Sequence, residues 1–358
     1  MIMKAKELAK KLKVSPATIS LVLNRKPGIS DHLRNSLIQQ IKELGCEEML
    51  LAHEPDDQAQ VLSSRLGIVY LIYTQTEGSY EKSAFYPAIL EGAELEAREN
   101  DYNFFVFHVG PQSGTVKALH PSVHAIGAVV QTQQITAQLL QELETLKIPI
   151  VFVDAYRPDL PASCVCVNNS QGVYTAVHHL YEMGHRNIGY ISSGKDTDMA
   201  LDRRRFFSLA LADHQLPDCP EQYFTALADS AETVSDLSKQ FRAHPPTVTA
   251  FMAENDIVAW QTIQALQSEG YKIPADYSVV GFDDRSVCTM TEPTLTTIKN
   301  FPHLMGRQAV SMIRSKMRLK AFKMEHLPLK YELPTQLVIR NSVRPLEPAE
   351  SSPSDQDS

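Results

Sequence analysis

The chain has 358 residues, of which 43% are hydrophobic and 21% charged, ordinary values for a globular protein of two or three domains. It holds no run of about 18 apolar residues and no signal-peptide core, so we expect no membrane span and a cytoplasmic location. The five cysteines are odd in number and scattered, which predicts reduced thiols, no disulfide and no metal or other cofactor.

The net charge of −8 alone argues against a nucleic-acid binder, but its distribution reverses that conclusion. Residues 1–45 hold nine Lys or Arg and three acids, a net +6, which leaves −14 for the remainder. A basic end on an acidic body is the electrostatic pattern expected where phosphate contact is confined to one domain.

Three short segments with helical apolar spacing open the chain, at 4–12, 15–24 and 30–44. Ser15 is placed to cap the second helix, with Pro16 at its first position, and Ser30 is placed to cap the third. Together they predict an all-α helix-turn-helix domain over residues 1–45. The apolar positions predicted to form its core are Ala5, Leu8, Ala9, Leu12, Ile19, Val22, Leu23, Leu33, Leu37, Ile41 and Leu44.

Residues 46–64 are acidic, contain Pro55 and carry no Lys or Arg, which predicts a linker. From residue 65 to 344, short apolar strands alternate with amphipathic helices, the pattern of parallel sheets covered on both faces. So many units predict an α/β core of two doubly wound lobes. The tail 345–358 is nearly devoid of apolar residues, which predicts disorder. The expected strands are 67–73, 103–107, 127–130, 150–153, 165–167, 188–192, 248–252 and 278–282.

Seven motifs, in order along residues 3–340, resemble the LacI/GalR family of transcriptional regulators. The resemblance implies a helix-turn-helix head, a hinge, a periplasmic-binding-protein-like core of two lobes, homodimerisation and a small effector in the cleft. The motifs begin at Val14-Ser15-Pro16, Phe85-Tyr86-Pro87, Ile150, His179-Leu180, Glu254-Asn255-Asp256, Ser278-Val279-Val280 and Leu295-Thr296-Thr297.

The resemblance assigns DNA contact to the head. Short hydroxyl and amide side chains near a helix N-terminus reach phosphates or base edges, and Lys or Arg neutralise phosphates. The residues expected at this interface are Lys4, Lys6, Ser15, Pro16, Ala17, Ser20, Leu21, Asn24, Arg25 and Ser30.

Two positions depart from the family. Leu21 stands where many relatives carry Arg or His, and a leucine can meet only a thymine methyl group. The linker places Pro55, inside an acidic stretch, at or near the position where relatives insert a leucine into the minor groove. Because of both departures, the head can read a base sequence that differs from those of its relatives.

The effector site is expected where the carboxyl ends of strands from both lobes converge. Carboxylate, guanidinium and amide groups there suit the vicinal hydroxyls of a sugar, and an aromatic ring can stack on it. We expect Trp260 to serve packing or a dimer interface instead. The residues predicted to bind the effector are Phe85, Tyr86, Asp154, Arg203, Asn255 and Asp283.

The main interpretation is therefore a repressor with three partners. They are a near-palindromic DNA operator, a second copy of the chain that completes the homodimer, and a sugar-like effector that releases the DNA. One alternative is a sensor of the same fold with weakened or altered DNA binding. Others are a solute-binding module without DNA function, and an enzyme. The enzyme class is disfavoured because neither a Gly-x-Gly-x-x-Gly nor a P-loop follows the first core strand.

Overall fold

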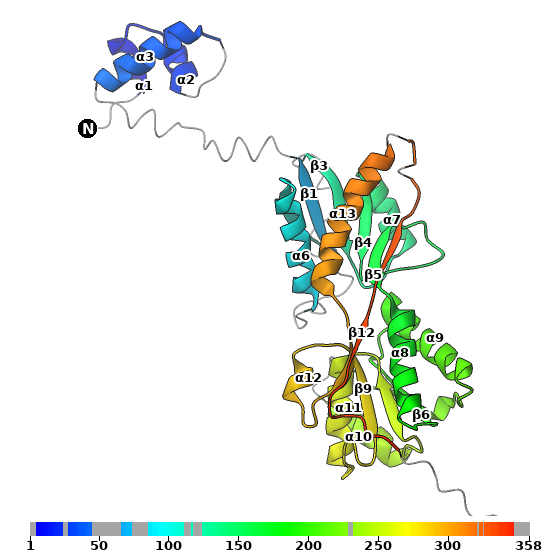
Figure 1. The fold of residues 1–358 in the computed structure, drawn as a ribbon. Coiled ribbons are helices and arrows are strands. Elements are labelled where there is room, and N and C mark those ends of the chain that lie inside the picture. The colour runs from blue at the N-terminus through cyan, green and yellow to red at the C-terminus, as the bar shows by residue number, and fades with distance from the viewer. Residues whose placement is uncertain are drawn as a thin grey trace, which may run out of the picture. The chain divides into compact units, whose positions relative to one another are not determined.

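The computed structural model describes residues 5–23, 28–44, 66–73, 85–110, 116, 124–227, 232–320, 322–324 and 326–346 (Figure 1). The chain divides into two compact units, Met1–Arg65 and Leu66–Ser358, called here the head and the core unit. The predicted linker at 46–64 and most of the predicted tail lie outside the described residues. None of the helices in the described ranges has the length and apolarity to cross a membrane.

The head is a three-helix unit of α1 (Ala5–Lys11), α2 (Pro16–Leu23) and α3 (Asp31–Glu43). Leu8, Ile19 and Ile41 are fully buried between the helices. Ser15 Oγ accepts the Thr18 N–H at 3.0 Å, and Ser30 Oγ accepts the Leu33 N–H at 3.3 Å, so both predicted caps form.

The prediction of the head core was wrong at two positions. Leu33 and Leu44 are each 40% exposed, whereas Leu37 and Ile41 are buried. Leu33 lies in the first turn of α3 and Leu44 is its C-cap, so both lie at the ends of the helix.

The first lobe is a six-stranded sheet in the order β11-β5-β4-β3-β1-β2, with every neighbouring pair parallel. Helices α6 (Phe85–Glu99) and α13 (Pro302–Lys320) pack side by side on one face, and α7 (Ala137–Glu144) covers the other (Figure 1). The strands are β1 (Gly67–Tyr73), β2 (Asn103–Val109), β3 (Ala125–Gln131), β4 (Ile150–Val153), β5 (Cys164–Val167) and β11 (Lys330–Leu333).

The second lobe repeats this plan with the order β12-β10-β9-β8-β6-β7, in which only β12 runs antiparallel to its neighbour. The strands are β6 (Ile188–Ser192), β7 (Tyr223–Thr225), β8 (Ala250–Ala253), β9 (Ser278–Asp283), β10 (Thr296–Lys299) and β12 (Gln336–Val338). The helices are α8 (Asn169–Glu182), α9 (Asp198–Asp213), α10 (Thr233–Ala243), α11 (Asp256–Ser268) and the short α12 (Val287–Met290).

The chain passes between the lobes three times, from β5 to α8, from β10 to α13 and from β11 to β12. Neither lobe is therefore continuous in sequence, and the segments that cross form the joint on which the lobes can close. The described part of the chain extends to Leu346, whose N–H donates to the Met183 carbonyl at 2.7 Å.

Helix α9 begins at Asp198, where Thr197 caps it, and its first turn carries the buried Met199 and Ala200. The sequence pattern predicts a helix over 203–214, so the prediction missed the first five residues of α9.

Helices α6 and α13 approach each other so closely that only glycine fits at their crossing. A Cβ on Gly92 would lie 1.9 Å from the His303 carbonyl oxygen, and one on Gly306 would lie 1.9 Å from the Ile89 carbonyl oxygen. The obstacles are backbone atoms, so they cannot move aside as a flexible side chain would.

Gly306→Ala should therefore destabilise the core unit by about 1–3 kcal/mol, even though alanine is the better helix former by about 1 kcal/mol. The measurement is the denaturation midpoint of the full chain. Ser315→Ala, at an exposed position of the same helix, is the control and should change stability by less than about 0.5 kcal/mol. A Gly306→Ala variant as stable as this control would contradict the close crossing.

Candidate functional site

A cavity of about 330 Å³ opens between the lobes, at the carboxyl ends of strands from both sheets. All six side chains predicted to bind an effector line it: Phe85, Tyr86, Asp154, Arg203, Asn255 and Asp283. They come from five separate segments of the chain, so the fold brings together groups that are far apart in sequence. That they lie together is a finding, and their role in binding is taken up below.

Arg203 on α9 is the centre of the cavity wall and is 6% exposed. Its Nε donates to Asn169 Oδ1 at 3.0 Å, its Nη1 to the Glu254 carbonyl at 2.8 Å and its Nη2 to Asp283 Oδ1 at 3.2 Å. Its guanidinium carbon also lies 3.8 Å from the centre of the Phe282 ring. A guanidinium has five N–H donors, so this one is held rigid while keeping further donors for a bound molecule.

Asp283, the last residue of β9, is the anionic partner. It accepts from Arg203, from Arg285 Nη2 at 2.7 Å and from Asn300 Nδ2 at 3.0 Å, and its side chain is only 4% exposed. Its backbone has φ of +113°, which a residue other than glycine adopts only when its surroundings enforce it. Ion pairs and hydrogen bonds thus fix the position of this carboxylate.

Asp154 faces the cavity from the first lobe, directly after β4, and also has a positive φ of +57°. Burial, with a smaller contribution from nearby Asp283, raises the pKa of this carboxyl to about 7, although Arg203 and a hydrogen bond with Tyr86 oppose the rise. Near neutral pH this group is divided between its acid form, which donates a hydrogen bond, and its carboxylate, which accepts one.

Glu254, Asn255 and Asp256 follow β8 and have three separate roles. Glu254 Oε2 accepts the Ser193 N–H at 2.9 Å and orders the loop after β6. Asn255 Oδ1 caps α11 by accepting the N–H groups of Ile257 and Val258, both at 3.1 Å, which leaves its amide nitrogen to face the cavity.

Asp256 is fully buried behind the cavity wall. It accepts from Thr297 Oγ1 at 2.5 Å and from the Arg285 N–H at 2.7 Å. Burial, and secondarily Asp283, raise its pKa to about 7. Asp256 therefore supports the wall and does not line the cavity.

Sequence reasoning missed several lining residues. Trp260 and Gln261 on α11 both line the cavity, a position that the expectation of packing or a dimer interface for Trp260 did not include. Gln261 is 7% exposed and its Oε1 has no hydrogen-bond partner among the described residues. Their spacing of three and four residues from Ile257, which also lines the cavity, is the helical signal that could have found them. The other missed residues are Gln133, Ser193, Lys195, Thr197, Met199, Ala200, Glu254 and Arg285.

In the head, the predicted DNA-contacting residues are only partly described. Ser15, Pro16, Ala17, Ser20 and Ser30 are exposed. Ser15 and Ser30 are also helix caps, so contact with DNA would have to use the remaining hydrogen-bonding capacity of each hydroxyl. Lys4, Asn24 and Arg25 lie outside the described residues, and of Lys6 only the helical backbone is described.

Leu21 lies on the recognition helix α2 and is half-buried. A Cβ placed on Gly28 would lie 3.3 Å from its side chain, and its carbonyl accepts Arg34 Nη1 at 2.9 Å. Leu21 therefore contributes to packing the turn after α2, which limits how much of it can face a base.

No group of three or more His, Cys, Asp or Glu that could hold a metal ion occurs within the described ranges. The four cysteines that they include are free thiols, and three of these, Cys164, Cys166 and Cys288, are buried.

The chain is similar to known transcriptional regulators. A family model described as a periplasmic binding protein-like domain matches residues 177–343. The HTH-type transcriptional repressor PurR of Aliivibrio salmonicida is 26% identical over 350 residues, covering 95% of this chain and 99% of that one.

Two solved structures share the fold. A CelR–cellobiose complex matches with a TM-score of 0.67 and 22% identity, covering 95% of this chain and 99% of that one. A lac repressor dimer bound to operator and the anti-inducer ONPF matches with a TM-score of 0.65 and 22% identity, covering 96% and 100%.

Asp154→Asn should alter how stability depends on pH. Because the folded pKa of Asp154, about 7, lies above its ordinary value of 3.8, the folded state binds the extra proton between these values. This contribution to the free energy of unfolding is present at low pH and is lost as pH rises through about 7. Relative to Asp154→Asn, the wild type should therefore lose stability from pH 5 to pH 8 in denaturant titrations.

The control is Asp213→Asn, which removes an exposed carboxylate of α9 outside the cavity. Its difference from wild type should stay nearly constant over the same pH range. A constant difference between Asp154→Asn and wild type would contradict the raised pKa.

Proposed function

We propose that the chain is a LacI/GalR-family transcriptional regulator, a sequence-specific DNA-binding repressor whose operator affinity is set by a small molecule. The head binds a near-palindromic operator as part of a homodimer, and the core unit binds the effector between its lobes. The protein is not an enzyme, and as a DNA-binding regulator it works in the cytoplasm. The PurR repressor, and the lac repressor dimer bound to operator, support this proposal by their likeness.

One observation supports the ligand-binding role most directly. Six side chains chosen from the sequence converge on one interlobe cavity, around a buried arginine whose position is fixed by three hydrogen bonds. Preformed polar groups in a cavity between lobes are typical of small-molecule sites.

The effector we infer is a sugar or a related metabolite. The cavity offers a hydrogen-bond acceptor at Gln261 Oε1 and donors at Asn255 and Arg203, beside the ring of Phe85. Hydroxyl groups both donate and accept, so a polyol satisfies such a mixed set without bringing a net charge. The CelR structure, a complex with cellobiose, has the same fold.

We infer further that the effector releases DNA. Such a ligand must bind the lobe arrangement that is incompetent for DNA more tightly than the competent one, since equal affinity shifts no population. The alternative, a sensor with weakened DNA binding, rests on the half-buried Leu21 of the recognition helix, and the experiments on DNA distinguish the two.

Asn255→Ser should raise the effector concentration needed for half-release of DNA about tenfold, the equivalent of about 1.4 kcal/mol. Serine still caps α11, but it has no amide nitrogen to reach the cavity. The effector is first found by a thermal-stability screen of monosaccharides, disaccharides and nucleosides. Release is then followed by fluorescence anisotropy of labelled operator DNA.

Affinity for DNA without effector should match wild type, because Asn255 lies in the core unit. Asn341→Ser, an exposed change outside the cavity, is the control and should behave as wild type throughout. Unchanged release by Asn255→Ser would remove Asn255 from the site. Failure of every screened compound to stabilise the protein would count against the sugar assignment.

A further inference from the structure

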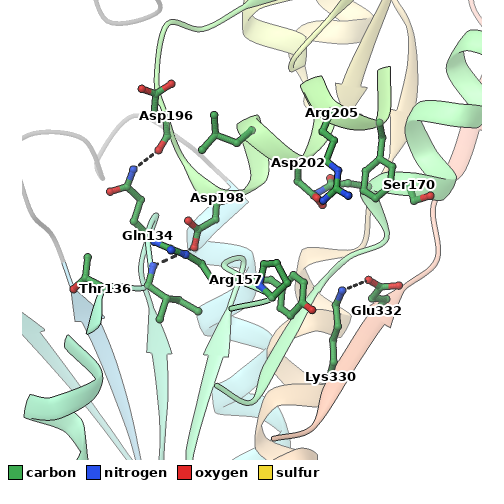
Figure 2. Close-up of a pocket in the computed structure, with 16 residues that line it drawn as sticks. Gln134, Thr136, Arg157, Ser170, Asp196, Asp198, Asp202, Arg205, Lys330 and Glu332 are labelled. Atoms are coloured by element: carbon green, nitrogen blue, oxygen red, sulfur yellow. Dashed lines mark hydrogen bonds and ion pairs between the residues drawn. The ribbon is translucent and has the colours of Figure 1, made fainter. Parts of the chain in front are cut away.

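A second cavity, of about 600 Å³, lies between the lobes on another side of α9 and shares no lining residue with the first (Figure 2). Tyr156, Arg157 and Lys330 line it from the first lobe, and Asp198 and Asp202 from α9. The proposed effector site does not use it.

The charges of this second cavity do not balance. Arg157 pairs with Asp159 at 2.5 Å, and Lys330 pairs with Glu332 at 2.5 Å, so each of these two cations already has a carboxylate partner. Lys330 also lies over the ring of Tyr156, 3.5 Å from its centre.

Asp196, Asp198, Asp202 and Arg205, by contrast, form no ion pair with any described residue. Asp198 accepts the backbone N–H of Ile135 at 3.1 Å and Asp202 accepts the side-chain amide of Asn169 at 3.2 Å, both neutral donors. Three carboxylates thus face one guanidinium, and the excess charge of the cavity is negative.

Two of these carboxylates are arranged as a pair. Asp198 and Asp202 are four residues apart on α9, so they share one face of the helix about 5–6 Å apart. Burial raises the pKa of both carboxyls, and the nearby cations, Arg157 at Asp198 and Lys330 with Arg205 at Asp202, oppose this rise only in part. Leu201, Phe206 and Ile135 add apolar surface beside them. Two carboxylates one helical turn apart beside an apolar wall match two ammonium groups joined by a short hydrocarbon chain.

An anionic ligand fits this cavity poorly, since it would approach three unpaired carboxylates with one unpaired guanidinium to hold it. A neutral polyol would leave the two half-buried carboxylates without an ion-pair partner. The charge distribution therefore favours an organic cation.

The second cavity is joined to the first by Asn169, which is 2% exposed and begins α8 where the chain crosses between lobes. Its Oδ1 accepts from Arg203 in the first cavity, and its Nδ2 donates to Asp202 in the second. One amide thus contacts a charged group of each cavity.

Hydrogen bonds between the lobes also run beside this second cavity. Ile135 N–H donates to Asp198 Oδ2, and Asp198 N–H donates to the Gln133 carbonyl at 3.2 Å. The Gln134 side chain donates to the Asp196 carbonyl (Figure 2). A cation bound to Asp198 stabilises the carboxylate that accepts one of these bonds, and a carboxylate has room for both partners.

We propose that the second cavity binds a short aliphatic diamine, whose ammonium groups pair with Asp198 and Asp202 and whose presence holds the two lobes together at 133–135 and 196–198. The diamine site does not depend on the proposed repressor function. Any effect of the diamine on DNA release does rest on that function.

The test is calorimetric titration of the full chain with putrescine (1,4-diaminobutane) at 0.15 M salt, with 1,4-butanediol as the uncharged comparison. Putrescine should bind saturably with one site per chain, and butanediol should give no binding. Asp198→Asn and Asp202→Asn should each raise the dissociation constant for putrescine about tenfold or more, as expected for loss of a charge-assisted hydrogen bond. Asparagine keeps an oxygen for the Ile135 and Asn169 donors, so the fold is retained.

The matched control is Asp213→Asn, which removes the same charge from the same helix outside the cavity. It should leave putrescine affinity within twofold of wild type. An equal loss in all three variants would mean non-specific attraction to an acidic protein and would overturn the site. Non-saturable binding, or butanediol binding as well as putrescine, would do the same.

Hydrogen exchange tests the second half of the proposal. Putrescine should slow exchange of the Ile135 amide and its neighbours in wild type but not in Asp198→Asn. Saturable binding with unchanged exchange would show that the cation occupies the cavity without holding the lobes. None of these measurements uses DNA or a sugar, so their failure would leave the proposed repressor function unaffected.

Discussion

The buried ion pair of Arg203 and Asp283 is the interaction on which the architecture of the site depends. Their side chains are 8% and 4% exposed, at a depth where an unpaired charge costs several kcal/mol. Arg203 satisfies this constraint by joining four segments of the second lobe: α9, the end of β9, the carbonyl that follows β8 and the start of α8. Removing either partner leaves the other charge buried without a counter-charge, which lowers the free energy of unfolding by about 3–5 kcal/mol. The pair thus fixes one wall of the cavity before any ligand arrives.

The opposite wall belongs to the first lobe, which contributes Phe85, Tyr86 and Asp154. The two walls are joined by three crossing segments and by hydrogen bonds between 133–135 and 196–198. A ligand that touches both walls therefore has a differential affinity for the closed and open lobe arrangements, and the proposed control of DNA binding requires this difference. Asn169 adds a physical route by which a second cavity can affect the same arrangement.

Much of the fold could be predicted from sequence because its strands are buried on both faces. The strands at 67–73, 150–153 and 188–192 were predicted with the bounds that the structure shows, since continuous apolar runs between helices leave little ambiguity. The six effector candidates came from the family resemblance and from their places near strand ends. Trp260 and Gln261 share a helix face with Ile257, but the sequence does not show which face of α11 meets the cavity, because tertiary packing sets the rotation of the helix.

The most direct measurement of the central claim is affinity selection of random-sequence duplex DNA on the full chain, sequenced at two salt concentrations and repeated with the effector found by screening. A ligand-controlled repressor should enrich one short palindrome at both salts, because base contacts survive screening that weakens phosphate contacts. The same palindrome should be lost when effector is present. Weak binding that falls steeply with salt and enriches no sequence would contradict a specific repressor, and enrichment that effector leaves unchanged would contradict control by the core unit.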